Sequence, residues 1–435
     1  MFRFLTLITT LFFCLATSSP CDGQVGGVSI DPKGILQLTP AVPSKTDFSP
    51  APPEVAHRND SRHLSLKRLE ATILEHQRLQ RPLPVEIRYL AGLQRIEEVV
   101  LLPSENDAIL IGPAAGWTRS PGGGLVDPQT QRPLLELDDL AVALRFSIAS
   151  NQPSSFIGCS IDPTDAGLKR YARYLRKLKG PLDSQRFPSL VKGMQQAMGL
   201  QDVRIFGVPD NSRFASKLVI ADYFLKRLAM GFDRPPIKGW VSYMDLLSKS
   251  GKNAVRRQHR FWFVATHNTL TRSADHRIWH FNGPGLAVRT AATTSKDSDK
   301  SKASPVAARM AAHLTDHFPL LAKHIPVFGE LENLARLAVA AEIVVNAPIA
   351  ESQTRWHSRV LVDPQLYLPK TTRVPRHVSS LAVIRKARGR NWIMSISGGV
   401  KLQPPPVASG NAATINPRLR IHRRPKDSTK WWWDG

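Results

Sequence analysis

Apolar residues recur three and four positions apart along several stretches of the chain, which is the spacing that places them on one face of an α-helix. The stretch 212–232 gives the clearest example, because Ser212 suits an N-cap and Gly231 suits a helix end. The same spacing predicts further helices in residues 59–80, 135–147, 167–180, 187–199, 305–325 and 327–345.

Other stretches are rich in β-branched and aromatic residues, which is typical of strands. Residues 260–266 and 277–283 predict an antiparallel pair, and glycines and prolines in 120–133 predict a hairpin. Because helices and strands mix without strict βαβ alternation, we expect an α+β fold, with a mixed, partly antiparallel sheet packed against amphipathic helices; the alternative is α/β. Further strands are predicted in residues 85–90, 96–102, 108–117, 159–163 and 202–209.

The beginning of the chain is typical of an exported protein. Residues 1–18 combine Arg3 with an apolar run and small residues, as a secretory signal peptide does, so we expect a secreted, periplasmic or cell-envelope location. Residues 19–60 are rich in Pro and Ser and predict a linker. Beyond the leader, Cys21 and Cys159 are the remaining cysteines, and whether they pair is left open.

The rest of the chain divides by polarity. We expect a central α+β domain over residues 61–390, either as one unit or as two subdomains that divide near 150–160 or 235–250. The polar, low-complexity segment 291–305 predicts a mobile insertion. Residues 401–435 lack a periodic apolar pattern, and we expect them to form a disordered basic tail.

The charge balance favours anionic partners. The chain has 59 Lys and Arg against 35 Asp and Glu, a formal net charge of +24, which attracts polyanions in general. The alternative is an ordinary solvated basic surface. Two segments concentrate the charge, the predicted helix 167–180 and the tail, and together they supply the polyanion-binding candidates Lys169, Arg170, Arg173, Arg176, Lys177, Arg423 and Arg424.

The dipeptide Asp-Pro occurs repeatedly after β-type residues. Asp accepts backbone N–H groups two residues ahead, and Pro fixes the backbone for a turn, so the pattern predicts strand ends. Asp162, which is followed by Pro163, also suits a helix N-cap. The alternative is a carboxylate pair, Asp31 with Asp162, from a duplicated binding site. The four aspartates are Asp31, Asp127, Asp162 and Asp363.

Histidines cluster in two places, and neither cluster predicts a metal site. His313 and His317 are four residues apart, but the Glu of the metalloprotease pattern is replaced by Leu314. The other cluster has no accompanying Cys, and its aromatic neighbours indicate a half-buried sheet. We therefore expect no metal and no cofactor. The members of this second cluster are His259, His267, His276 and His280.

Catalytic residues are not apparent from the sequence. The chain has no Gly-x-Ser-x-Gly elbow and no phosphate-binding loop with Lys-Ser/Thr. On the predicted helix 212–232, Asp222 and Lys226 are four residues apart, and we expect a surface ion pair. If the protein is an enzyme, we expect its cleft beside Arg213, Asp222 and Lys226.

Four strings, in this order, resemble an uncharacterised family of secreted planctomycete proteins known as a domain of unknown function: IGCSIDPTDAGLKR, DNSRFASKLVIADYFLKRLAMGF, RFWFVAT and PVFGELENLARLAVAA. The resemblance covers about residues 85–350 and is most specific at 221–223 and 226–231. It implies export and one large central domain. It implies no activity, ligand or catalytic residue.

Two hypotheses follow. The first is an exported, non-enzymatic cell-envelope or periplasmic protein whose basic surface binds an anionic polymer or membrane surface; the sequence shows no specific nucleic-acid motif and no particular protein partner. The alternative is a hydrolase-like exported enzyme of unrecognised type. An enzyme should show a pocket with converging titratable groups of perturbed pKa, whereas a binding protein should show a broad basic face.

Overall fold

The computed structural model describes residues 27–31, 33–39, 49–120, 124–150, 155–178, 184–250, 259–266, 270–292, 303–348, 356–387, 390–394, 396–403, 411–412 and 430–435. Within these residues the chain forms eleven α-helices and two large sheets, which confirms the predicted α+β class. The predicted signal peptide and most of the insertion 291–305 lie outside the described residues.

The larger sheet has eight strands, and most neighbours in it are far apart in the sequence. Its pairs are antiparallel except two, β2 with β14 and β10 with β17. The strand β17 lies between β8 and β10 and so completes the middle of the sheet. In spatial order the strands are β1 (Gly27–Ile30), β2 (Ile35–Thr39), β14 (His377–Ser379), β9 (Leu200–Phe206), β8 (Ile157–Pro163), β17 (Ile396–Leu402), β10 (His259–Ala265) and β13 (Leu286–Ala292).

The second sheet has seven strands, and the chain passes into it and back between β10 and β13. Its last strand in space is the end of the chain, which pairs antiparallel with the strand at 59–65. In spatial order the strands are β18 (Asn411–Ala412), β11 (Leu270–Arg272), β12 (Ile278–Phe281), β4 (Glu98–Leu102), β5 (Asp107–Ala114), β3 (Asn59–Ser65) and β19 (Trp432–Asp434). Two hairpins stand apart, β6 (Thr118–Arg119) with β7 (Leu125–Val126) and β15 (Val383–Ala387) with β16 (Arg390–Met394).

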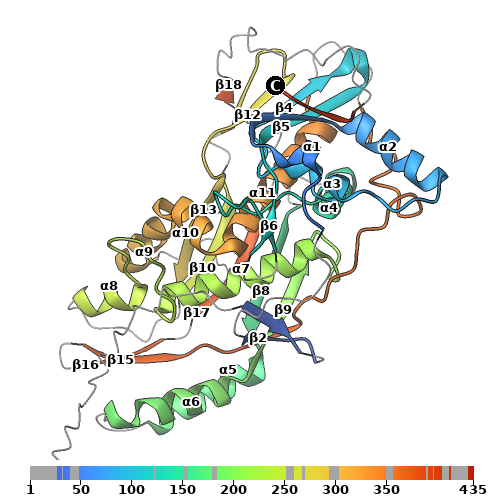
Figure 1. Cartoon of the computed structure of the whole chain (residues 1–435). Coiled ribbons are helices and arrows are strands. Elements are labelled where there is room, and N and C mark those ends of the chain that lie inside the picture. The colour runs from blue at the N-terminus through green and yellow to red at the C-terminus, as the bar shows by residue number, and fades with distance from the viewer. Residues whose placement is uncertain are drawn as a thin grey trace, which may run out of the picture.

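Three long helices lie between the sheets: α4 (Leu137–Ala149), α7 (Arg213–Met230) and α11 (Pro326–Asn346). Figure 1 shows α5 (Asp165–Lys177) and α6 (Phe187–Met198) as a helical pair at the opposite end of the molecule from the seven-stranded sheet. The remaining helices are α1 (Pro53–Ala56), α2 (Leu66–Arg78), α3 (Val85–Arg88), α8 (Tyr243–Ser250), α9 (Pro305–Asp316) and α10 (Phe318–His324).

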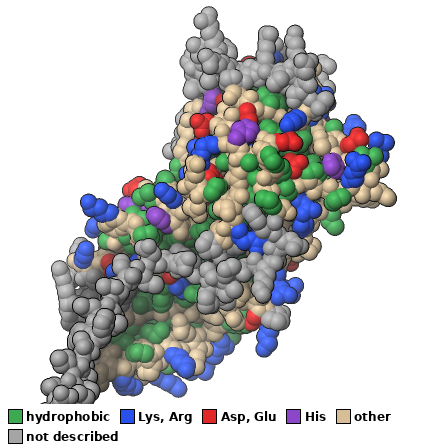
Figure 2. Space-filling view, viewed as in Figure 1, with side chains coloured by type: hydrophobic (Ala, Val, Ile, Leu, Met, Phe, Trp, Pro, Cys, Tyr) green, Lys and Arg blue, Asp and Glu red, His purple; other side chains and the backbone are tan. Residues whose placement is uncertain are grey.

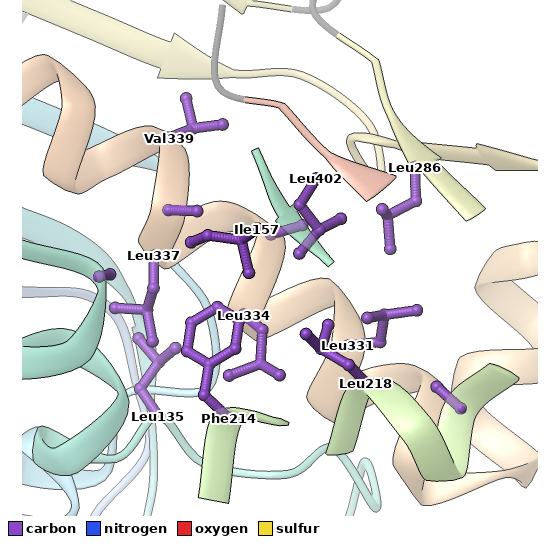
Figure 3. Close-up of a cluster of buried hydrophobic side chains, with 14 of the residues drawn as sticks. Leu135, Ile157, Phe214, Leu218, Leu286, Leu331, Leu334, Leu337, Val339 and Leu402 are labelled. Atoms are coloured by element: carbon purple, nitrogen blue, oxygen red, sulfur yellow. The ribbon is translucent and has the colours of Figure 1, made fainter. Parts of the chain in front are cut away.

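One continuous hydrophobic cluster joins the two sheets through these helices. In its centre, Phe214 and Leu218 of α7 face Leu331 and Leu334 of α11, beside Ile157 of β8 (Figure 3). Fifteen of the eighteen residues of α7 are buried, so this helix is surrounded on all sides rather than amphipathic. The two sheets therefore share one core.

Local signals place several element ends correctly. The Ser212 hydroxyl accepts the Ala215 N–H at 3.1 Å, and Gly231 ends α7 at a φ of 75°, as predicted. At the Asp-Pro sites, carboxylates accept backbone N–H groups ahead of them: Asp127 from Gln129 at 2.7 Å, Asp363 from Gln365 at 2.8 Å, and Asp31 from Ile35 at 2.8 Å. This confirms the turn interpretation for three of the four aspartates.

The fourth site differs from the expectation. Asp162 lies within β8, and the N-cap of α5 is Thr164, whose hydroxyl accepts the Gly167 N–H at 3.0 Å. Pro163 keeps the residue before it extended, so the strand runs two residues further than a cap at Asp162 would allow.

The predicted pairing of 260–266 with 277–283 is wrong. The strand β10 pairs with β13 and β17, whereas β12 pairs with β11 and β4 in the other sheet. An alternating pattern predicts a half-buried strand, but it does not specify the partner strand. Two further expectations also fail, because residues 59–65 form β3 ahead of α2, and residues 85–88 form α3.

Both ends of the chain are more structured than expected. Residues 27–30 and 35–39, which fall in the predicted linker, form β1 and β2. The prediction of a disordered tail is wrong for residues 430–435, where Trp431, Trp432 and Trp433 are buried and β19 extends a sheet. A terminal segment without a periodic apolar pattern can still order itself on an available strand edge.

Candidate functional site

The five cations predicted on helix 167–180 occupy the outer face of α5, and all five are exposed. The opposite face of α5 packs on α6, with Tyr171 against Leu190 and Met194 in a small separate core. The two helices touch at Gly167 and Gly193, where a Cβ would lie 2.3 Å from the Met198 carbonyl and the Tyr174 hydroxyl respectively. The cations therefore stand on a fixed surface.

The basic face of α5, defined by Lys169, Arg170, Arg173, Arg176 and Lys177, has little compensating charge. The helix itself carries one carboxylate, Asp165, in its first turn. Within the part of the chain that the structure describes, none of the five cations forms an ion pair. Lys and Arg side chains project along the lower edge of the molecule in Figure 2, where α5 and α6 lie in Figure 1. Arg423 and Arg424, the other candidates, lie outside the described residues.

Two members of this face, Arg170 and Arg176, also have contacts within the fold. The Arg170 guanidinium donates to the Ala197 carbonyl at 3.1 Å and the Met198 carbonyl at 3.5 Å, which satisfies carbonyls at the C-terminal end of α6. Arg176 Nε lies 3.4 Å from the Ala172 carbonyl one turn earlier. Lys169, Arg173 and Lys177 are spaced by four residues and form the free row of the face.

A second cluster of charges gathers at the N-terminal end of α7. Arg213, the first residue of α7, contacts three carboxylates: Glu136 Oε1 lies 2.9 Å from its Nε, Glu330 Oε1 lies 3.0 Å from Nη2, and Asp139 accepts from Nη1. Lys217, one turn later, is 2.8 Å from the same oxygen of Glu330. Three helices, α4, α7 and α11, therefore meet at one cluster of charged side chains, which we call the Arg213 cluster.

The pKa values of the carboxyl groups in the Arg213 cluster shift in different directions. Burial raises the pKa of Asp139 to about 7, against the opposing charge of Arg213. Burial also raises the pKa of Glu136, and again Arg213 opposes it. For Glu330 burial acts in the same sense, but Lys217 and Arg213 lower its pKa below the ordinary value. Sequence analysis named Arg213 and missed its three carboxylate partners, because they come from sequence positions far apart.

The pair Asp222–Lys226 is buried, whereas the sequence predicted a surface ion pair. Lys226 Nζ lies 3.0 Å from Asp222 Oδ2, and the two side chains are 2% and 0% exposed. The Lys226 ammonium also reaches the Ile161 carbonyl of β8 at 3.4 Å. The i, i+4 spacing was predicted correctly, but the pattern did not show that strands cover this side of α7.

The candidate histidines are separated by the fold. His259 lies in the eight-stranded sheet, with Nδ1 3.2 Å from the Tyr243 hydroxyl, whereas His280 pairs with Glu98 at 3.0 Å in the other sheet. His267 lies outside the described residues. Among the residues that are described, no three His, Cys, Asp or Glu side chains converge as metal ligands.

The helical pair His313 and His317 has a packing role. Their ring centroids are 4.2 Å apart, and the Trp240 ring lies 5.1 Å from that of His313. The Val241 N–H donates to His313 Nε2 at 3.4 Å, so that nitrogen carries no proton. Burial lowers the pKa of His313, and the neighbouring His317 lowers it further.

A small hollow lies where β10 ends and β11 begins, beside α11. It is lined mainly by apolar atoms and by the Arg336 side chain. The Arg336 guanidinium donates to the carbonyls of Ile96 and Gly283 and to Glu332, so its hydrogen-bonding capacity is used within the fold. Among its described lining residues, the hollow therefore offers no converging acid and base groups.

Cys159 is buried in β8, and Cys21 lies outside the described residues. Within the described residues, no helix combines the length and the apolar character that a membrane span requires.

The comparisons identify one family match. A model described as a protein of unknown function (DUF1598) matches residues 159–243, from β8 through α5, α6, β9 and α7 to the start of α8. No curated protein matches the chain, and no solved structure does. The matched region includes the basic face of α5, Arg213 and the buried pair of α7. Residues 159–243 are therefore similar to a domain family of unknown function, and the match assigns no activity.

Proposed function

We propose that this chain is an exported cell-envelope or periplasmic protein that binds anionic polymers or anionic membrane surfaces through the basic face of α5. The observation that carries the proposal is the row of exposed cations on a rigid helical pair, without ion-pair partners among the described residues. The leader at 1–18 and the resemblance of residues 85–350 to secreted planctomycete proteins support export.

Charge and rigidity act together in this proposal. Uncompensated cations attract a polyanion, and binding releases the counterions that the polyanion had condensed. Because the apolar face of α5 is fixed on α6, the cations lose little backbone freedom on binding. The interaction should therefore weaken steeply as salt concentration rises, since exposed charges are screened.

The test compares two variants with the same net charge. In the first, Lys169→Glu, Arg173→Glu and Lys177→Glu reverse the free row of α5. In the matched control, Arg81→Glu, Lys238→Glu and Arg359→Glu reverse three exposed cations elsewhere. Binding to heparin and to phosphatidylglycerol vesicles is measured at low and high salt, with thermal unfolding as a check on folding.

We expect the α5 variant to lose most of its binding and the control to keep it. Equal loss in both variants would show that only net charge matters, and unchanged binding in both would overturn the proposed site. For export, the mature N-terminus is determined on protein recovered from its host. A start after about residue 18 is expected, and full-length chain in the cytosol would contradict export.

A second candidate function is a hydrolase-like exported enzyme, and the Arg213 cluster favours it. A buried Asp139 with a pKa of about 7 holds a proton that it can exchange near neutral pH, as a general acid or base must. The test is a panel of chromogenic ester, glycoside and phosphate substrates with the native chain and Asp139→Asn. Turnover that the substitution abolishes, without a loss of folding, would favour the enzyme.

A further inference from the structure

One side of the eight-stranded sheet packs on α7, and the other side carries rings and cations. Along β10, Phe261 and Phe263 are buried in the core, whereas Trp262 between them and Arg260 before them are only half-buried. The strand β9 alternates in the same way and ends on Phe206, which is 37% exposed. We call this second side the outer sheet face.

A single row of directly paired residues crosses five strands of the outer sheet face. Arg204 of β9 is opposite Ser160 of β8, which is opposite Gly399 of β17. Gly399 is opposite Trp262 of β10, which is opposite Arg289 of β13. At about 4.8 Å per strand, the two arginines stand about 19 Å apart, with one ring and two small residues between them.

The neighbouring row adds a second aromatic position and a further cation. Phe206 is opposite Gly158, which is opposite Lys401. The Phe206 ring lies 5.3 Å from that of Phe156, and Lys401 Nζ lies 5.3 Å above the Phe156 ring. Two aromatic positions, around Trp262 and around Phe206, thus flank a strip of small residues, Gly158, Ser160 and Gly399, of which Gly158 and Ser160 are buried.

The charge on this face is unevenly distributed. Arg204 and Arg289 are exposed, and Arg260 lies 5.9 Å from the Trp262 ring. Among the described residues of these five strands, the carboxylates on this face are Asp162 and Asp202, which are opposite each other at the far end of β8 and β9 from Phe206. The part of the face that holds the rings is therefore positive.

We infer that the outer sheet face binds a single-stranded nucleic acid, with bases stacked on Trp262 and Phe206 and phosphates paired with Arg204, Arg289 and Lys401. Aromatic rings between cations are what single-strand binders use, because every base has a flat face and every linkage has a charge. Arg pairs with phosphate oxygens through two parallel hydrogen bonds.

The ring types favour bases over sugars as the stacked groups. Phe206 and Phe156 offer no hydroxyl, and the carboxylates that would bind sugar hydroxyl groups are at the other end of the face. An acidic polysaccharide would meet the cations but would gain little from these rings. This site is separate from the basic face of α5, which needs charge alone.

The test measures fluorescence anisotropy of a labelled oligothymidylate with the full mature chain. Trp262→Ala and Phe206→Ala should each weaken binding about tenfold, which equals about 1.4 kcal/mol and lies within the range for one stacked base. Phe232→Ala is the matched control, since Phe232 is 41% exposed beside Arg227 but lies outside this face. Heparin, a polyanion without aromatic rings, should bind the two ring variants as it binds the native chain.

The outcomes separate this inference from the proposed function. If heparin binds through α5 but the ring variants bind oligothymidylate like the native chain, the inference fails and the proposed function stands. If oligothymidylate binding depends on Trp262 while heparin does not bind, the inference stands and the proposed function fails. Equal weakening of heparin and oligothymidylate by Trp262→Ala would assign the face to acidic glycans and overturn the inference, as would the absence of oligothymidylate binding.

A second variant guards against misfolding of the ring substitutions. Arg204→Gln with Arg289→Gln removes two exposed side chains that are not needed for the core. It should reduce the slope of the logarithm of the oligothymidylate binding constant against the logarithm of salt concentration by the amount that about two phosphate contacts contribute. An unchanged salt dependence would overturn the assignment of these arginines to phosphates.

Discussion

Lys226 Nζ lies 3.0 Å from Asp222 Oδ2, and both side chains are enclosed between α7 and the eight-stranded sheet. The second oxygen of the carboxylate, Asp222 Oδ1, is buried without a hydrogen-bond partner in the described structure. Burial raises the pKa of Asp222, although the ammonium opposes it. A buried pair of this kind holds each charge in place only while the other is present.

Removing the lysine alone should therefore be costly. We expect Lys226→Met to lower the free energy of unfolding by about 3–5 kcal/mol, because it leaves an uncompensated buried carboxylate. The double variant Asp222→Leu with Lys226→Met should recover most of this loss. Urea unfolding measures both, and a double variant as unstable as the single one would contradict the explanation. Arg78→Met, which removes an exposed pair with Glu75, should cost less than about 0.5 kcal/mol.

The Arg213 cluster should make the stability of the protein depend on pH. Since burial raises the pKa of Asp139 to about 7, the folded chain keeps a proton that the unfolded chain loses near pH 4. The stabilisation is complete below about pH 4 and is lost as the pH rises toward 7. Asp139→Asn removes this titration, so the decrease in unfolding free energy over this range should be shallower. A variant with the same slope as the native chain would show that Asp139 is ionised throughout.

The contact of His313 with His317 should make stability respond to pH in the opposite direction. Because the pKa of His313 is lowered in the folded chain, the unfolded chain binds more protons below about pH 6.5. This contribution is complete above pH 6.5 and is lost as the pH falls. We expect His313→Gln to reduce the loss of thermal stability on acidification, with Trp240 fluorescence as a local probe. A steeper loss in the variant would contradict this assignment.

The end of the chain should contribute measurably to stability. Asp434 accepts hydrogen bonds from the buried Arg62 and contacts His57; burial alone would raise its pKa, but these two partners lower it. Asp434→Ala should cost about 1.5–3 kcal/mol, because it removes a charge-assisted bond from a buried guanidinium. Chemical unfolding measures the loss. The matched substitution Glu54→Ala, which removes the exposed contact with Lys430, should have little effect.

How much the sequence predicts depends on whether the cause is local. The ends of α7 were predicted because Ser212 and Gly231 act within four residues of themselves. The turns at Asp127 and Asp363 were predicted for the same reason. The partners of Trp262 and the carboxylates around Arg213 could not be predicted, since pairing across long sequence separations is decided by packing of the whole chain. The buried Asp222 was misplaced because α7 is covered on all sides, which a two-face pattern does not indicate.

The position of β17 also constrains how the molecule is made. Its partners β8 and β10 end at Pro163 and Ala265, yet β17 begins at Ile396. While the ribosome is still adding the residues in between, these two strands expose edges that attract other extended chains. The central sheet is therefore assembled only late in synthesis, and a holding chaperone during that interval would raise the yield of native protein.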